Sequence, residues 1–196
     1  MTLIVERWQY ALAVLVPFVL AAWWVSFGGH LDAVPSFFLL HLGVYMIHQI
    51  EEHLWPGGFR QFTNAHVFES GQDNFPVDKG GVALVNVGYV WLPLAAAALA
   101  PQTLYLLGVA WFGLSFVNSF SHIGTSIRLK MYNPGVVTAL LGLLPFSVYF
   151  FATQYAAGAL STGAIALAIL AGVVLHIPVA ALFVVPFRAA QARLTG

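Results

Sequence analysis

The stretch of this sequence best suited to chemistry is the run His48-Gln49-Ile50-Glu51-Glu52-His53. Residues three and four positions apart share one face of an α-helix, so Glu51 and Glu52 flank His48, whereas His53 points away from that face. Imidazole nitrogens and carboxylate oxygens together suit iron, manganese or zinc. The run therefore predicts a divalent metal site with His48, Glu51 and Glu52 as ligands. The two glutamates are also candidate catalytic residues.

Other polar residues lie in segments that are otherwise apolar. Asn118 and His122 stand one helical turn apart on one face, and we expect His122 in the core of the metal site. His176 is expected to complete the ligand set, together with His66 or Glu69, which repeat the histidine-x-x-glutamate spacing. His41 lies seven positions before His48. It is about 10 Å away along a helix, too far to share one ion.

Composition decides which elements position these residues. Of the 196 residues, 60% are hydrophobic and only 7% are charged. Soluble domains carry about 25% charged residues. This composition excludes a soluble domain, a disordered chain and a basic nucleic-acid binder, so the expected partner is the lipid bilayer and not nucleic acid. The chain has no cysteine, which excludes a thiolate metal site.

A membrane-spanning helix needs about 20 mainly apolar residues. The sequence predicts an all-α fold: a polytopic membrane bundle of six transmembrane helices. The expected spans are Trp8 to Phe27, Ser36 to Trp55, Val82 to Leu99, Gln102 to Gly124, Gly135 to Phe151 and Ser161 to Phe187.

The seven basic residues orient this bundle. With six spans, every lysine and arginine falls on one side: Arg7, Arg60, Lys79, Arg128, Lys130, Arg188 and Arg193. The positive-inside rule makes that side cytoplasmic, with both termini inside. We expect one integral membrane domain over residues 1–196, multi-pass in a bacterial inner (plasma) membrane. The stretch 56–81 is polar with interspersed phenylalanines, and it predicts a cytoplasmic interfacial loop.

The spacing His48-x-x-Glu51-Glu52 on a membrane helix resembles the HXXEE domain family of small integral membrane proteins. The resemblance covers most of the chain, from the second predicted span to the sixth. It implies that His48, Glu51 and Glu52 are important, and it implies no particular reaction.

A second resemblance is to membrane glutamate proteases of the CAAX type, which carry paired glutamates followed by histidine motifs on later helices. Glu51-Glu52, His122 and His176 follow that order. The protease pattern has an arginine four residues after the second glutamate, where this chain has Pro56. The resemblance therefore extends to the chemistry of the site only.

The leading hypothesis is a membrane-embedded, metal-dependent enzyme acting on a hydrophobic or lipid-like substrate near the inner leaflet. The carboxylates would bridge two ions in a di-iron oxygenase or desaturase; a zinc ion would instead catalyse hydrolysis. A metal-free hydrolase is an alternative, with Glu51 or Glu52 as general base and Asn118 or Asn86 holding an oxyanion. A small transporter or ion-binding protein is a third.

Overall fold

The computed structural model describes the backbone of residues 2–195 and the side chains of residues 5–194, and this part of the chain contains helices and no strands. Each long helix is described by the segments that compose it. In chain order they are α1 (Thr2–Arg7), η1 (Trp8–Ala11), α2 (Leu12–Phe27), α3 (Val34–His53), α4 (Phe59–Phe62), η2 (Thr63–Val67), α5 (Lys79–Ala83), η3 (Leu84–Trp91), α6 (Leu92–Leu99), α7 (Tyr105–Leu129), α8 (Val136–Thr138), η4 (Ala139–Leu143), α9 (Leu144–Ala156) and α10 (Thr162–Thr195). The segments η2, η3 and η4 are π-helical.

The number of membrane-length helices differs from the prediction. In the described residues, five helices, not six, are long and apolar enough to cross a bilayer: Val5–Phe27, Lys79–Leu99, Tyr105–Leu129, Val136–Ala156 and Thr162–Leu194. The segment that falls short is α3, which has 20 residues but carries the polar run at its end. Neighbouring helices cover its polar side chains, so α3 does not need an apolar surface. Five long apolar helices make this a multi-pass membrane protein.

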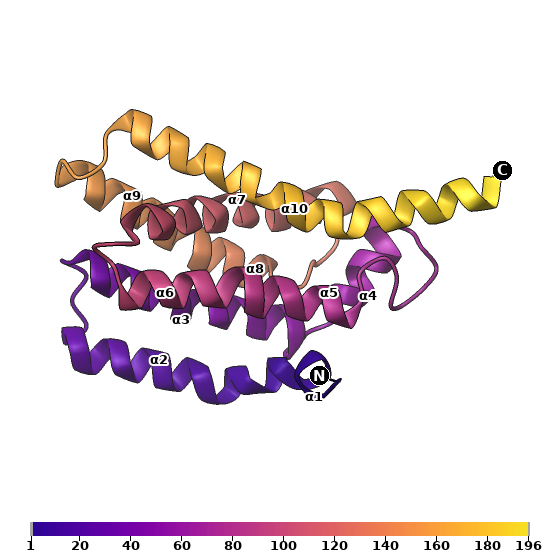
Figure 1. Cartoon of the computed structure of the whole chain (residues 1–196), viewed down its shortest axis with the longest axis horizontal. Coiled ribbons are helices and arrows are strands. Elements are labelled where there is room, and N and C mark those ends of the chain that lie inside the picture. The colour runs from indigo at the N-terminus through magenta and orange to yellow at the C-terminus, as the bar shows by residue number, and fades with distance from the viewer. Residues whose placement is uncertain (1, 196) are drawn as a thin grey trace.

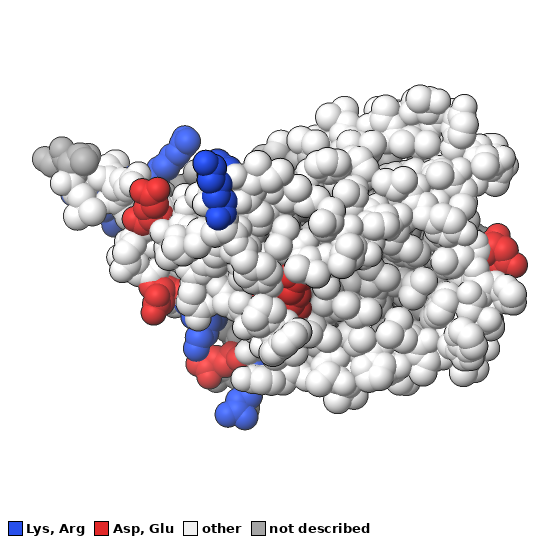
Figure 2. Space-filling model, turned by 180° about the vertical axis from the view of Figure 1, so that it is seen from behind, with Lys and Arg blue, Asp and Glu red and all other residues white. Residues whose placement is uncertain are grey.

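The helices lie side by side in a bundle (Figure 1). The inner helix α3 packs against α2 and α6, and α7 packs against α6, α9 and α10. The N-terminal α1 and the end of α10 lie toward the same end of the molecule (Figure 1). Lysine and arginine side chains gather at that end on the face shown in Figure 2. We call it the basic end.

Local sequence explains where the site-bearing segments begin and end. Pro35 occupies the first turn of α3, where its missing N–H leaves no unpaired donor. The Asp78 carboxylate caps α5 by accepting a hydrogen bond from the Gly81 N–H at 2.7 Å. At the C-terminal end of α7, Lys130 adopts the left-handed conformation that ends the helix. The chain then turns back through the short loop 131–135, which carries α8 to the end of α3.

The interior of the bundle has two different regions. Toward the end far from the basic residues, phenylalanines from α3, α7 and α9 form an aromatic core. Its rings stack closely, with the centroids of Phe112 and Phe150 3.8 Å apart. Toward the basic end, buried polar residues replace the aromatic ones: His48, Gln49, Glu51, Glu52 and His122. The candidate functional site lies in this second region.

Candidate metal site

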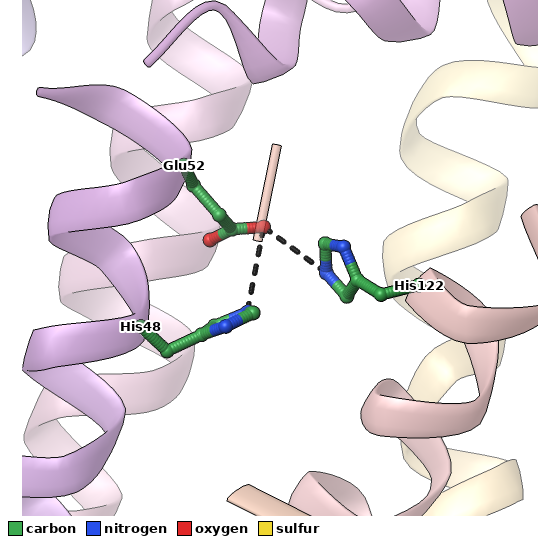
Figure 3. A group of neighbouring side chains, drawn as sticks. All are labelled: His48, Glu52 and His122. Carbon is green, nitrogen blue, oxygen red and sulfur yellow. Dashed lines mark ion pairs between the residues drawn. The ribbon is translucent and has the colours of Figure 1, made fainter. Parts of the chain in front are cut away.

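Three buried side chains from two helices converge near the basic end. His48 and Glu52 stand one turn apart on α3, and His122 comes from α7 (Figure 3). Glu52 Oε1 lies 3.7 Å from His48 Nε2 and 3.3 Å from His122 Nε2. One ligand atom from each residue lies within 4.8 Å of the other two, so the group can hold a metal ion. We call these three residues the His/Glu cluster.

The meeting of His48 and His122 confirms a prediction made from helix faces alone. Their ring centroids are 4.8 Å apart, although the residues are 74 positions apart in sequence. His48 is fully buried and His122 is 4% exposed. Both imidazoles therefore face the bundle interior, where lipid cannot reach them.

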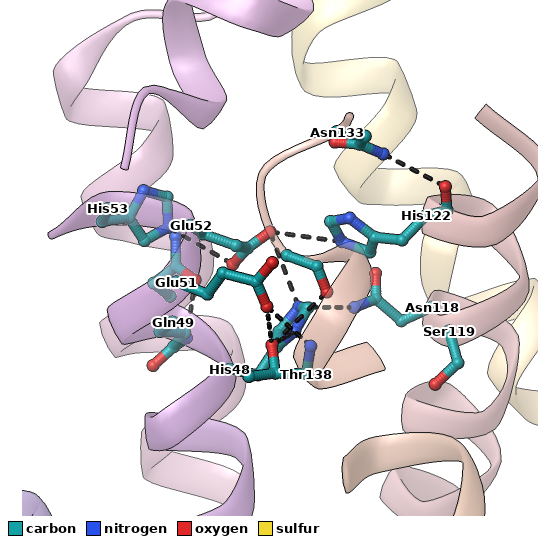
Figure 4. Close-up of polar contacts among 12 residues, drawn as sticks. His48, Gln49, Glu51, Glu52, His53, Asn118, Ser119, His122, Asn133 and Thr138 are labelled. Carbon is teal, nitrogen blue, oxygen red and sulfur yellow. Dashed lines mark hydrogen bonds and ion pairs between the residues drawn. The ribbon is translucent and has the colours of Figure 1, made fainter. Parts of the chain in front are cut away.

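A threonine that the sequence analysis missed sets the orientation of His48. The Thr138 hydroxyl donates to Glu51 Oε2 at 2.5 Å and lies 2.9 Å from His48 Nδ1 (Figure 4). A hydroxyl has one proton, so the second contact requires the His48 Nδ1–H to donate to Thr138. The protonated nitrogen thus faces Thr138, and Nε2 keeps its lone pair for the cluster. Partners of this kind set the tautomer of metal-binding histidines.

Glu51 has a different position from Glu52, although the two are adjacent. Its carboxylate accepts hydrogen bonds from the N–H groups of Val137 and Thr138 at 3.1 and 2.6 Å, and from the Tyr132 hydroxyl at 2.8 Å. It therefore caps α8 and contacts His48 only through Thr138. Desolvation and the nearby Glu51 raise the pKa of Tyr132, which keeps this phenol a donor. The structure thus places Glu51 as an anchor of the site, outside the group of possible ligands.

Gly135 lies directly against the two imidazoles of the cluster and covers one side of the site. A Cβ at this position would stand 2.6 Å from His122 Cε1 and 2.9 Å from His48 Cε1. The backbone φ of +101° is also one that side-chain-bearing residues rarely adopt. Glycine therefore lets the 131–135 loop lie directly against both imidazoles. The sequence predicted Gly135 only as the first residue of the fifth span.

The second oxygen of Glu52 contacts His53, which lies on a different face of α3 from His48. His53 Nε2 lies 3.4 Å from Glu52 Oε2. The long glutamate side chain reaches across the helix surface, so a residue on a neighbouring face becomes its partner. Phe59 of α4 lies beside both ends of this arrangement, with its ring 5.8 Å from the rings of His53 and His122.

Asn118, a predicted catalytic residue, also reaches the cluster. Its side-chain nitrogen lies 3.3 Å from His48 Nε2, on the same side as Glu52 Oε1. This amide is a donor to the lone pair that a metal ion would use. Asn86 is not part of the site, because it bonds Gln49 across the α3–η3 contact at 2.6 Å. That bond matches the interhelical role expected of polar residues in membrane bundles.

The remaining predicted ligands lie elsewhere. Gly113 of α7 faces α10, since an added Cβ would be 1.9 Å from the Ala168 carbonyl oxygen. His122 follows nine residues later, about two and a half turns, and so faces the opposite side of α7. His176 on α10 contacts the Gly172 carbonyl at 2.7 Å instead. His66 and Glu69 are exposed, and neither joins the cluster.

Two cavities adjoin the cluster from the basic end. The larger, about 420 Å³, is lined by Glu52, His53, Arg60, Lys79 and residues of α1 and η1; we call it the polar cavity. The smaller, about 180 Å³, is lined by His122, Asn118 and apolar side chains that include Phe62 and Val67; we call it the side cavity. Phe59 lines both. The cluster is therefore buried but not sealed.

The three converging side chains form a donor set known from mononuclear metal sites. Two imidazole nitrogens and one carboxylate oxygen are the donor set of catalytic zinc sites of the His₂Glu type, and also of mononuclear iron sites. Three protein ligands leave a position open for water or substrate. The chain offers such an open site next to two cavities.

No curated protein and no solved structure matches the chain. A family model described as "Protein of unknown function with HXXEE motif" matches residues 39–150. The matched segment contains the whole His/Glu cluster with Thr138 and Gly135, whereas His176 lies outside it. Because the match covers more than half of the chain, the protein belongs to the family defined by the HXXEE motif.

Proposed function

We propose that this protein is a metal-dependent hydrolase that binds one divalent ion through His48, Glu52 and His122 and acts on a lipid-like substrate at the membrane interface. The observation that carries the proposal is the convergence of three buried ligand atoms from α3 and α7. Ionisable groups inside a membrane bundle are costly and mark functional sites. A bound cation offsets the cost of burying Glu52.

The arrangement of Glu51 favours one ion over two. A di-iron site requires carboxylates that bridge the ions. Glu51 is held by Tyr132, Val137 and Thr138 and contacts no imidazole directly, so Glu52 alone supplies a carboxylate. A mononuclear site supports hydrolysis, the alternative that the sequence also allowed, over the di-iron oxygenase.

Hydrolysis adds one water across the bond that breaks. His48, Glu52 and His122 would hold a zinc ion, which would supply a Lewis acid and lower the pKa of a bound water to about 7. By position, His53 would receive the proton of the attacking water, since it lines the polar cavity and contacts Glu52 Oε2. The same proton then goes to the leaving group. Asn118 would orient the attacking water or the substrate beside His48.

The location of the site supports a substrate from the membrane. The cluster lies toward the basic end, which the positive-inside rule places at the cytoplasmic face. We propose that both termini lie in the cytoplasm and that the membrane is the bacterial inner membrane. The polar cavity and the side cavity both adjoin the cluster and would give a substrate access to it.

The first experiment measures bound metal in the detergent-purified protein. We expect about one zinc ion per chain, because three ligands and one open position make one site. Glu52→Gln should lose the ion, whereas Glu51→Gln, the matched control, should keep it. One tightly bound iron per chain would favour oxygen chemistry over hydrolysis. Two ions, or none in wild type after supplementation, would overturn the mononuclear site.

The second experiment tests the reaction separately from metal binding. Zinc-loaded protein is incubated with ester and phosphoester lipids in mixed micelles, and product release is followed. His53→Gln should keep its zinc and lose about 100-fold in kcat, since a positioned acid–base group contributes this much. Unchanged kcat in this variant would remove His53 from the mechanism.

A further inference from the structure

The polar cavity has a charge pattern that the metal site does not explain. Arg60 and Lys79 line it, and so do Glu52 of the cluster and the adjacent His53. Two of the chain's seven basic residues are thus directed to one cavity that adjoins a candidate catalytic ion. The opposing charges in the lining are Glu6 and Glu52.

Arg60 is held in place while it lines the cavity. Its guanidinium donates to the backbone carbonyl of Asp73 and to the Asn74 side chain, the latter at 3.0 Å. These bonds engage one nitrogen of a group with five N–H donors, so the other donors are free to bind an anion. The arginine is therefore preorganised, which lowers the entropic cost of binding.

Lys79 supplies a second positive charge without a local partner. It is exposed, and within the described part of the chain it forms no ion pair. The carboxylate of Glu52, which belongs to the cluster, is already shared among three imidazoles. A divalent ion bound there would make the inner wall of the cavity positive as well. An anion in the cavity would then face cationic groups at both ends.

The side cavity next to it has the opposite character. Its accessible surface is mainly apolar and includes Phe59, Phe62 and Val67, although polar residues such as Thr63, Ser121 and Asn133 also line it beside His122. Phe59 lines both cavities, and its ring lies 5.8 Å from the ring of His122. A molecule that places a charged group in the polar cavity can therefore extend an apolar part past Phe59. The bond between the two parts would lie near the His/Glu cluster.

From this placement we infer that the polar cavity binds the phosphate-type head group of a membrane amphiphile, with Arg60 and Lys79 as its anchors. Arginine forks and lysine point charges are the side chains that recognise phosphate. The inference rests on the proposed hydrolase only for the reaction. The binding of the head group is a separate property of the two basic residues.

Binding is measured with protein in detergent, in metal-free and zinc-loaded forms. The probes are lysophosphatidic acid, inorganic phosphate and the zwitterionic lysophosphatidylcholine. Lysophosphatidic acid should bind most tightly, since it combines a phosphate with an apolar chain. Lys79→Gln should weaken its binding about tenfold, the loss of one charge-assisted contact. Arg193→Gln removes an exposed charge of α10 and should leave binding unchanged.

Arg60 requires a second variant because its bonds also hold the 73–74 loop. Arg60→Lys keeps the charge and removes the fork, and it should weaken lysophosphatidic acid binding while the protein remains folded. Wild-type affinity in both Lys79→Gln and Arg60→Lys would overturn the assignment. Equal affinity for inorganic phosphate would overturn the amphiphile as ligand. Binding to the metal-free protein with no zinc uptake would support the head-group site while the proposed hydrolase failed.

Discussion

His41 and His48 lie seven residues apart on the same face of α3, yet their surroundings differ completely. His41 is enclosed by the aromatic core: its ring stacks on Phe112 at 3.9 Å, and Nε2 bonds the Ser115 hydroxyl at 2.7 Å. His48 has Thr138 on one nitrogen, with Glu52 and Asn118 at the other. Both rings are fully buried, so burial alone does not distinguish them.

The difference is what surrounds each imidazole. His41 has one neutral partner and an apolar enclosure, which suits a histidine that holds α3 against α7. His48 has a carboxylate and a second imidazole within reach, and the residues beside it line cavities that open at the basic end. A polar residue in a membrane helix is a functional candidate. Two features therefore distinguish the site around His48 from the structural contact of His41 with Ser115. Charged partners converge on His48, and cavities give access to them.

The largest contrast is expected between substitutions of these two histidines. His48→Gln should reduce bound metal from about one ion per chain to almost none, because one of three ligands is lost. His41→Gln should keep the ion and lower stability by about 1–2 kcal/mol through loss of the ring stack. Elemental analysis and thermal unfolding of both variants test this. Metal loss in His41→Gln would end the distinction between the two regions.

Two glycines, one against the cluster and one on the exposed surface of α7, sharpen the comparison. Gly135→Ala should destabilise the protein by about 2–4 kcal/mol, because the backbone is strained and the new Cβ meets both imidazoles. Gly124→Ala is the matched control, since nothing lies within 4 Å of a Cβ there and α7 favours alanine over glycine. Chemical unfolding in detergent compares the two. Similar stability for both would mean that the 131–135 loop does not lie against the cluster.

A smaller effect is expected at Thr138. Thr138→Val keeps the shape and removes the hydroxyl, so His48 loses the partner that sets its tautomer. Metal affinity should fall about 10–100-fold, as for other outer partners of metal ligands. Thr138→Ser keeps the hydroxyl and should bind metal nearly as well as wild type. A competition titration with a zinc chelator measures both, and equal affinity in Val and Ser variants would remove Thr138 from the site.

The smallest effect on bound metal is expected from a substitution in the aromatic core. Ser115→Ala leaves the buried His41 Nε2 without its partner and should cost about 1–3 kcal/mol, the penalty for an unpaired buried polar group. Bound metal should not change, because Ser115 lies seven residues, about two helical turns, before His122, the cluster residue of α7. Thermal unfolding and metal content are measured on the same preparation. A change in metal content would indicate that the two regions are coupled.

The sequence by itself determined the membrane bundle and the centre of the site. Low charge and long apolar runs allow only membrane helices, and the predicted and observed boundaries agree within several residues. The spacing of His48 and Glu52, and of Asn118 and His122, placed each pair on one helical face. Because polar faces avoid lipid, the meeting of α3 and α7 followed from the sequence alone.

The count of spanning helices did not follow in the same way. Helix α3 is among the most buried elements of the bundle, and its polar side chains are covered by other helices. Hydropathy measures how well a segment tolerates lipid, so it says little about a helix that contacts mainly protein. Among the described residues, five helices therefore qualify by apolarity, and α3 packs among them.

Only the tertiary structure decided the separate roles of Glu51 and Glu52. In the sequence both lie near His48 and both are candidate ligands. The loop 131–135 and α8 fold back onto the end of α3, and their N–H and hydroxyl groups bind Glu51. Glu52 is left to His48 and His122. Helical periodicity describes contacts within one helix, whereas these partners come from a loop more than 80 residues away, whose position no local pattern records.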